Sequence, residues 1–318
     1  MTAVATEGER SARLVREIFL AGFMSGLPPE NVAWATHRLA RNMEDVHLRA
    51  GEVLYRQGEA TNAHYFVVYG EMVLAAEGVP PWTLGERSLI GTIDLTLDRA
   101  RTRTATATRD THLLRMPATD WLDMLEDNFE LMLRGVEGLA QGVYELRTTV
   151  PGGLPAEDGG PPVSVRSSAD GPLGLIERVI LLRGVPLLST GEVQALLDLA
   201  AHAVEIDMAE GDVVIARGEP NDAMFLTVSG AVSASPSATH PGETFGPGRL
   251  VLGSCAATSK DLGCEARATV PSRLLRVMRE DYFDAMEEHF QLARSSMKAL
   301  AGEREVLVNA AARRGGSV

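Results

Sequence analysis

The alternation of apolar and polar positions predicts a chain rich in short β-strands. One example is the run MFLTVS at 224–229, which places Met, Leu and Val on one face and Phe, Thr and Ser on the other. This is the period of a strand with one face buried. Glycines such as Gly58 and Gly70 separate these runs and indicate turns. Several short strands at regular spacing predict a closed roll or jelly roll.

The same pattern of strands occurs twice. The stretch GEVLYRQGE at 51–59 returns as GDVVIARGE at 211–219, and YFVVYG at 65–70 returns as FLTVSG at 225–230. The repeating unit is the size of a domain, well above the roughly 20–50 residues of solenoid repeats. Two tandem copies of one globular fold are therefore predicted.

Apolar residues spaced three and four positions apart predict helices on either side of the strands. The first copy has such a face at 14–19 and a second helix over 30–42, and the matching region of the second copy is 176–203. Each copy closes with a helix, which starts near Thr119 in the first copy and near Glu280 in the second.

A segment poor in large apolar residues separates the copies. Residues 151–172 read PGGLPAEDGGPPVSVRSSADGP, a composition that cannot repay the entropy of ordering and is typical of a flexible linker. At about 150 residues per domain, the length of 318 also indicates two domains. The predicted division is a first domain at 10–150, the linker at 151–172 and a second domain at 173–310.

The closing helix of the first copy carries a regular apolar seam. Its members are spaced alternately four and three positions apart, and they are Leu125, Phe129, Met132, Val136, Leu139, Val143 and Leu146. We favour packing of this seam on the strand roll of its own copy. The seam also permits a homodimer through the closing helix at 120–147. Gly135, Gly138 and Gly142 weaken a free-standing coiled coil, and the second copy places Arg304 on its seam.

Composition and charge exclude several classes of partner. The net charge of −13 argues against nucleic acid, and so against DNA, because binding to a duplex depends on Lys and Arg contacts with phosphates. No apolar run approaches the roughly 20 residues that span a bilayer, so no membrane partner is expected. Cys255 and Cys264 are the two cysteines of the chain. So few cysteines fit a reducing cytoplasm, and we expect both to be reduced rather than joined.

The common signatures of enzymes are missing from the sequence. It has no Walker-type glycine loop, no His-Glu-x-x-His, no Gly-x-Ser-x-Gly and no cysteine pair at zinc spacing. Its histidines are scattered, and no pair of carboxylates stands out by its spacing. We therefore expect a protein that is not an enzyme and has neither a resident cofactor nor a metal site.

Two segments of each copy resemble the cyclic nucleotide-binding domain family, to which the catabolite activator protein and the regulatory subunit of cAMP-dependent protein kinase belong. The opening is similar at 51–70 and 211–230. The phosphate-binding cassette and the strand after it are similar at 84–106, with 245–270 as the equivalent in the second copy. The resemblance implies a mainly β fold with flanking helices, as two tandem β-roll (jelly-roll) domains of the cyclic nucleotide-binding type.

The resemblance also implies how such a cassette works. Backbone N–H groups at the start of a short helix hold the cyclic phosphate, and one arginine pairs with its oxygens. In the family, a glutamate directly after the cassette glycine accepts the ribose 2′-hydroxyl. Gly91 and Gly253 match the glycine, whereas the glutamate position falls on Thr92 and Ser254. Both copies are therefore expected to lack this carboxylate.

The arginine of the cassette has two candidate positions in each copy. It falls on Arg103 in the first copy, with Arg101 as a close rival, and on Ala266 in the second copy, with Arg267 one place late. The candidate phosphate-binding residues of the first copy are Gly91, Thr92, Ile93, Arg101, Arg103 and Thr104. Those of the degenerate second site are Gly253, Ser254, Arg267 and Ala268.

The arginines of the first copy have a second interpretation. Arg99, Arg101 and Arg103 alternate, so on a strand they share one face. Because runs of charge usually cover surfaces, we favour a solvated strand face over an anion site. The threonines on the opposite face, between 102 and 108, are expected to form a packing ladder.

These patterns lead to one expected function and one alternative. The first is a non-enzymatic, cytoplasmic regulatory or adaptor protein, whose first domain senses a cyclic nucleotide or another small anion and signals to a partner protein through the closing helix. In the alternative, both pockets are vestigial and the rolls serve as an interaction scaffold or as part of a larger assembly. The sequence does not identify the partner.

Overall fold

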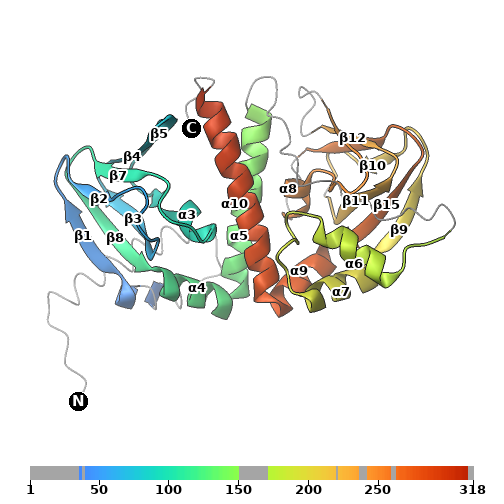
Figure 1. Cartoon of the computed structure of the whole chain (residues 1–318), viewed down its shortest axis with the longest axis horizontal. Coiled ribbons are helices and arrows are strands. Elements are labelled where there is room, and N and C mark those ends of the chain that lie inside the picture. Colours follow the sequence, from blue (N-terminus) through green and yellow to red (C-terminus); the bar gives the residue numbers. More distant parts are fainter. Residues whose placement is uncertain are drawn as a thin grey trace, which may run out of the picture. The chain divides into compact units, whose positions relative to one another are not determined.

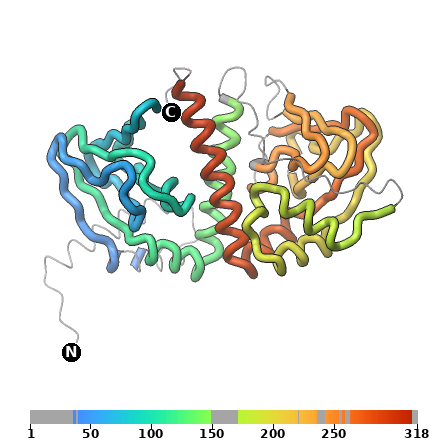
Figure 2. Tube along the Cα trace, in the orientation of Figure 1, coloured from blue at the N-terminus to red at the C-terminus, as the bar shows by residue number. Residues whose placement is uncertain are grey.

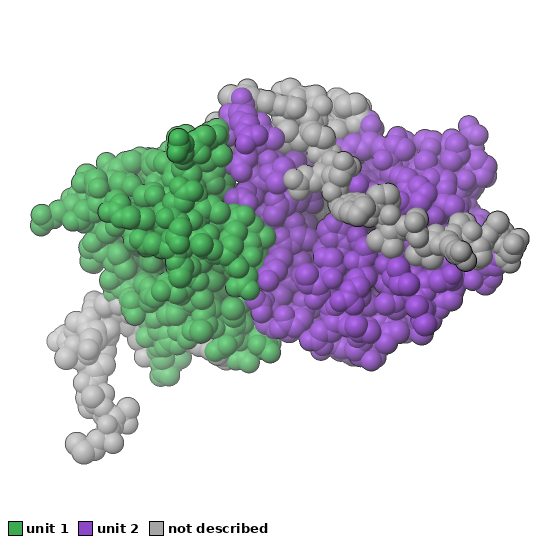
Figure 3. Space-filling view, viewed as in Figure 1, with its two compact units in different colours: residues 1–132 green, residues 133–318 purple. Residues whose placement is uncertain are grey.

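The computed structural model describes residues 36–37, 40–149, 171–219, 221–235, 242–258 and 263–313. The chain divides into two compact units, Met1–Met132 and Leu133–Val318 (Figure 3). The predicted helices at 14–19 and in most of 30–42 lie outside the described residues, as does nearly all of the predicted linker. The domain boundaries 10–150, 151–172 and 173–310 therefore stay a prediction.

Unit 1 is a roll of two antiparallel four-stranded sheets, with strand orders β1-β8-β3-β6 and β2-β7-β4-β5 (Figure 1). The elements in chain order are β1 (Glu44–Leu48), β2 (Val53–Tyr55), β3 (Ala63–Tyr69), β4 (Met72–Ala76), β5 (Val79–Leu84), β6 (Leu89–Ile90), α3 (Thr92–Thr96), β7 (Thr104–Ala107), β8 (Thr111–Pro117) and α4 (Ala118–Asp127). The core between the sheets includes Tyr55, Met72 and Leu113.

Unit 2 repeats this arrangement, with sheets β11-β15-β9 and β10-β14-β12-β13. Its elements are α6 (Leu175–Arg183), α7 (Val193–His202), β9 (Val204–Met208), β10 (Val213–Ile215), β11 (Ala223–Ser229), β12 (Val232–Ser235), β13 (Glu243–Phe245), α8 (Gly253–Ala256), β14 (Glu265–Ala268), β15 (Ser272–Met278), α9 (Arg279–Glu288) and α10 (Phe290–Arg313). The predictions of two β-rolls with flanking helices and of helices within 176–203 are confirmed.

The same glycine turn leads from one sheet to the other in each roll, between β3 and β4 in unit 1 and between β11 and β12 in unit 2. Gly70 has φ 106°, and a Cβ there would lie 2.4 Å from Oγ1 of Thr111; Gly230 has φ 83°, and its Cβ would lie 2.3 Å from Oγ of Ser272. Only glycine tolerates both the backbone angle and the close approach. These glycines therefore fix where the strands of each roll turn.

Each closing helix is two helices rather than the single one predicted. Asn128 ends α4 with φ −140° and is followed by α5 (Phe129–Thr149), and His289 ends α9 with φ −127° before α10. An extended residue interrupts the i→i−4 hydrogen bonding, so the helix axis changes direction there. The apolar periodicity continues through both breaks and so does not reveal them.

Most of α5 belongs to unit 2, where it runs beside α10 in the same direction (Figure 2). A Cβ on Gly135 would lie 3.3 Å from Cε of Met297, and one on Gly142 would lie 3.3 Å from Nε of Arg304. Gly135 and Gly142 thus make room for side chains of α10, whereas no atom lies within 4 Å of the Cβ position of Gly138. Burial between the helices lowers the pKa of the Arg304 guanidinium.

The seam of the first closing helix is largely covered within the chain. Val136 and Val143 are fully buried. The favoured expectation, packing on the roll of its own copy, is incomplete, because α10 of the second copy lies against α5. The homodimer through 120–147 stays a prediction.

Two further features bear on the expectations from composition. Cys264 is buried and takes part in a disulfide, so the expectation of two reduced cysteines is wrong for this structure. Within the described parts of the chain, no helix is both long enough and apolar enough to cross a membrane.

Candidate functional site

The cassette of the first copy begins at a glycine in the left-handed conformation. Gly91 has φ 80° and ψ 6° and precedes α3, while β6 leads into it. The chain returns to the roll through β7. This geometry presents the backbone N–H groups at the start of α3, which in a helix of five residues have few partners within the helix.

Arg101 and Arg103 lie on the inner face of the roll. From Arg101 to Ala107 every second residue is buried, with Arg101 2% and Arg103 4% exposed. The alternation predicted from the sequence is confirmed, but the favoured solvated face is wrong for these two arginines. Arg99 differs, since it is partly exposed and pairs with Asp94.

Arg101 is the arginine that reaches the cassette glycine. Its Nη1 donates to the carbonyl oxygen of Gly91 at 3.1 Å, and its Nη2 donates to the carbonyl oxygen of Ala63. The guanidinium lies 4.1 Å from the ring centre of Tyr55. A Cβ at Gly91 would come within 2.1 Å of Nη1, so only glycine allows this contact. Burial raises the pKa of the Tyr55 phenol, which therefore stays neutral beside the cation.

Arg103, the preferred arginine from the sequence, has a different neighbour. Its guanidinium lies 3.6 Å from the ring centre of Trp82 on β5, a cation–π contact. The structure thus distinguishes the two candidates for the cassette arginine: Arg101 contacts Gly91, and Arg103 contacts Trp82.

Asp94 is the residue that sequence reasoning missed. It is 6% exposed, and its carboxylate accepts from Nε of Arg99 at 2.9 Å, from Oγ1 of Thr102 at 2.9 Å and from the backbone N–H of Thr102 at 3.1 Å. These bonds fasten α3 to the start of the following strand. In the sequence, Asp94 stands out only because it is close to Arg99. That closeness predicts a carboxylate that balances the charge of the arginines, but it does not predict the hydrogen bonds with Thr102.

Several polar atoms of the first roll have no partner. Among the described residues, Nε1 of Trp82, Oγ1 of Thr92 and Nε of Arg101 are buried without a hydrogen bond. Buried polar groups nearly always have a partner, so such a set is typical of a site that binds a polar ligand. Of the remaining candidates, Ile93 is half-buried, whereas Oγ1 of Thr104 accepts from the backbone N–H of Gln57 on the other face of β7.

His64 is also buried and unpartnered at both ring nitrogens, within the described chain. Its ring meets Phe66 and Trp121 edge to face, so it lies on the face of β3 that packs against α4 rather than in the cassette. Burial, and secondarily the charge of Arg101, lower the pKa of His64 to about 3. This histidine is neutral at physiological pH.

The second copy has no glycine at the position that Gly91 occupies. The residue before α8 is Leu252, with φ 46° and ψ 58°, and Gly253 is the first residue of the helix. The match of Gly253 to Gly91 is therefore wrong by one position. Leu252 is 6% exposed and belongs to the apolar core together with Phe225 and Phe245. The side chain of Ser254 lies outside the described residues.

The arginine assignment in the second copy is also corrected. Ala266 pairs with Ile215 as Ala105 pairs with Tyr55, so the counterpart of Arg103 is Cys264. The inner face here is apolar. The counterpart of Arg101 falls among residues that are not described.

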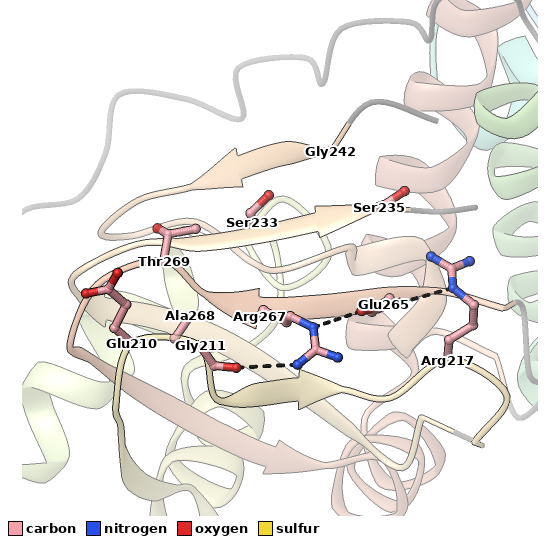
Figure 4. Close-up of a pocket in the computed structure, with 10 residues that line it drawn as sticks. All are labelled: Glu210, Gly211, Arg217, Ser233, Ser235, Gly242, Glu265, Arg267, Ala268 and Thr269. Atoms are coloured by element: carbon pink, nitrogen blue, oxygen red, sulfur yellow. Dashed lines mark hydrogen bonds and ion pairs between the residues drawn. The ribbon is translucent and has the colours of Figure 1, made fainter. Parts of the chain in front are cut away.

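Arg267 points away from that interior. It lies on the outer face of β14, and its Nε donates to Glu265 at 2.9 Å. Arg217 also donates to Glu265, at 3.2 Å, and Figure 4 shows both guanidinium groups directed at this carboxylate. The groups line an open pocket of about 710 Å³ on the outer face of the sheet. Ala268 is buried on the opposite face, so the structure does not bring Arg267 and Ala268 together with Gly253.

The end of α5 is attached to the second roll by charge and by packing. Arg147, 8% exposed, donates through Nε to Glu303 of α10 at 2.8 Å and through Nη1 to Glu243 of β13 at 3.2 Å. Tyr144 packs against the core of this roll. A helix that begins in unit 1 is thus held by three contacts in unit 2.

Comparison with known proteins agrees with this geometry. Residues 45–128 match the family model described as the cyclic nucleotide-binding domain. No curated protein matches the chain at a significant level.

Solved structures of kinase regulatory subunits are similar over most of their length. The regulatory domain of Toxoplasma gondii PKA with cAMP has a TM-score of 0.34 at 12% identity, covering 98% of this chain and 99% of that one. The regulatory subunit of a cAMP-independent protein kinase A from Trypanosoma cruzi, bound to guanosine, has a TM-score of 0.35 at 14% identity, covering 90% and 88%. At such scores and identities the likeness does not bear on what this chain binds.

Two results thus agree on the first copy, namely the family match over 45–128 and the cassette built around Gly91 and Arg101. The second copy repeats the order of strands and helices around an apolar interior. Residues 45–128 are thus similar to the cyclic nucleotide-binding domain family, and the second copy repeats the order of elements of the first.

Proposed function

We propose that this chain is a non-enzymatic, cytoplasmic regulatory protein whose first domain binds a small phosphate-bearing ligand, with a cyclic nucleotide as the leading candidate. One observation carries the proposal: the buried guanidinium of Arg101 lies at the cassette glycine, Gly91, and both its Nε and Oγ1 of the adjacent residue Thr92 are buried without a hydrogen-bond partner in the described chain.

The available groups favour an anion that accepts hydrogen bonds. Nε of Arg101 and Nε1 of Trp82 can only donate, and the hydroxyl of Thr92 can donate as well. The nearby carboxylate of Asp94 already accepts three hydrogen bonds and is not free to bind a ligand hydroxyl. A phosphate oxygen beside Arg101 would gain charge-assisted hydrogen bonds in a site of low polarity.

The second domain serves as the responding element in this proposal. Its interior holds Leu252 and Phe245 where a ligand would have to lie. The helix α5 begins in unit 1, and Arg147 and Tyr144 attach it to unit 2. A change in the first residues of α5 on ligand binding would therefore reach the second domain and, through it, a partner protein.

Calorimetric titration of cAMP, cGMP and cyclic di-GMP into the full chain tests this function. We expect one site per chain for at least one ligand, and a loss of about tenfold or more in affinity for Arg101→Met, since that change removes a charge-assisted contact. The control is Arg267→Met, which removes an arginine on the outer face of the second roll and leaves the affinity unchanged.

The alternative of a scaffold with two vestigial pockets has one observation in its favour. Arg101 already donates to the carbonyl oxygens of Gly91 and Ala63, so part of the cassette is satisfied by the protein itself. In that case none of the ligands produces heat with the wild-type chain.

A further inference from the structure

A second group of potential ligand atoms lies in unit 2, away from the cassette. It consists of Asp198 on α7, Glu288 at the end of α9 and His289 at the break between α9 and α10. One ligand atom from each side chain lies within 4.8 Å of the other two. Asp198 is distant in sequence from Glu288 and His289. The three residues therefore form no metal-binding motif that the sequence alone would reveal.

The histidine and the aspartate are already at a separation suited to a shared ion. Nε2 of His289 lies 3.3 Å from Oδ2 of Asp198. In a tetrahedral site with bonds of about 2.0–2.1 Å, two ligand atoms are about 3.3–3.4 Å apart. Glu288 is exposed and lies at the end of a helix, so a change of rotamer can bring its carboxylate nearer.

A neighbouring side chain orients the aspartate. Nε2 of Gln194 donates to Oδ1 of Asp198 at 2.9 Å, which leaves Oδ2 directed at His289. Outer-shell hydrogen bonds of this kind hold a metal ligand in position.

The fold does not require an imidazole at the helix break. In the first copy the corresponding residue is Asn128, which has nearly the same backbone angles, with φ −140° and ψ 91° against φ −127° and ψ 86° for His289. Oδ1 of Asn128 accepts from the backbone N–H of Leu131 at 3.0 Å and so caps α5. The histidine is thus a feature of the second copy alone.

We propose that Asp198, Glu288 and His289 bind a divalent transition metal of the zinc class. One imidazole nitrogen and two carboxylate oxygens are ligands that zinc accepts, with water in the fourth position. Two carboxylates beside a neutral imidazole match the double positive charge of the ion. The bound ion joins α7 to the junction of α9 and α10 and stabilises unit 2, independently of any ligand in the first domain.

Zinc titration of the full chain, after removal of metals with EDTA, tests the site. We expect one zinc per chain by calorimetry and a rise in the midpoint of thermal unfolding, because an ion that binds only the folded state stabilises it by mass action. His289→Asn, which installs the residue found in the first copy, is expected to weaken zinc binding about tenfold or more and to reduce the rise in midpoint at a given zinc concentration.

The chain contains a matched control for this experiment. His112 lies 2.8 Å from Asp45, and its side chain is 15% exposed, as is that of His289, but it belongs to no group of three potential ligands in the described chain. His112→Asn should leave zinc binding unchanged. Asp198→Asn provides a second test should His289→Asn fail to fold. Absence of zinc binding by the wild-type chain, or full retention of zinc by the folded variants at 289 and 198, would overturn the proposal.

Discussion

The guanidinium of Arg101 donates to the carbonyl oxygen of Gly91 at 3.1 Å, in the space that the side chain of any other residue at 91 would occupy. The two residues therefore form one structural unit. Glycine is needed here both for its backbone angle, φ 80°, and for the room that it leaves. Leu252 at the equivalent place fills that room with an apolar side chain.

Replacement of Gly91 by alanine tests this relationship in the absence of ligand. The change forces a left-handed angle on alanine, at a cost of about 1–2 kcal/mol, and also displaces the guanidinium of Arg101. Gly78→Ala is the control, because Gly78 has φ 76° but no atom within 4 Å of its Cβ position. We expect Gly91→Ala to lower the free energy of unfolding by about 2 kcal/mol more than Gly78→Ala, since hydrogen bonds from a charged group are lost.

Tryptophan fluorescence in urea measures this difference. All three tryptophans, Trp34, Trp82 and Trp121, lie in the first copy, so the signal follows the unfolding of that copy. Equal destabilisation by the two alanine substitutions would show that Arg101 does not depend on the space at Gly91.

His64 gives the first domain a predictable dependence on pH. Its pKa falls from the ordinary value of 6.5 to about 3 in the folded domain, because burial and Arg101 disfavour the imidazolium. The unfolded chain binds a proton below about pH 6.5, and the folded chain does not. The contribution to stability is therefore complete above pH 6.5 and is lost as the pH falls toward 3, by up to about 1.4 kcal/mol per pH unit.

His64→Met removes this dependence. Methionine is the residue at the equivalent position of the second copy, Met224, which is also buried. Urea midpoints from tryptophan fluorescence at pH 7, 6 and 5 should decline for the wild type and decline less for the variant. The two slopes would be the same if His64 retained an ordinary pKa in the folded state.

Arg147 holds the end of α5 to the second roll. Arg147→Ala leaves Glu303 and Glu243 without their shared cation, and we expect a loss of about 2–3 kcal/mol, less than for a fully buried pair because both carboxylates are partly exposed. Arg267→Ala is the control: the side chain of Arg267 is about half-exposed and pairs with the partly exposed Glu265, which keeps Arg217 as a partner, so its loss should cost less than about 1 kcal/mol.

Far-UV circular dichroism during urea unfolding measures both variants. The second copy has no tryptophan, so a circular dichroism transition without a matching change in tryptophan fluorescence reports on unit 2. Losses of similar size for Arg147→Ala and Arg267→Ala would mean that the contacts with Glu303 and Glu243 do not anchor the helix.

The strands of both rolls follow from sequence because their pattern is local. Alternation and glycine turns specify where each strand begins and ends, and the repeat of that pattern revealed the second roll. The same alternation placed Arg101 and Arg103 on one face, but a period of two does not say which face is buried. Only the closure of the roll around them shows that the arginines point inward.

Three other features depended on contacts between distant residues. In the sequence, Gly253 of the second copy was matched to Gly91 of the first. The strand pairing shows instead that Leu252 occupies the position equivalent to Gly91. The heptad seam of α5 predicted an apolar partner without identifying α10. The role of Asp94 required three donors that come together only in the folded loop.

The central claim is that the first domain, and not the second, holds a polar ligand site. Hydrogen–deuterium exchange of the full chain, with saturating cAMP, cGMP or cyclic di-GMP in parallel, tests it most directly. We predict that at least one ligand slows exchange of the backbone amides between Gly91 and Ala107 and leaves 252–258 and 263–268 unchanged. Protection confined to the second copy, or no protection in either copy with any of the three ligands, would contradict the account.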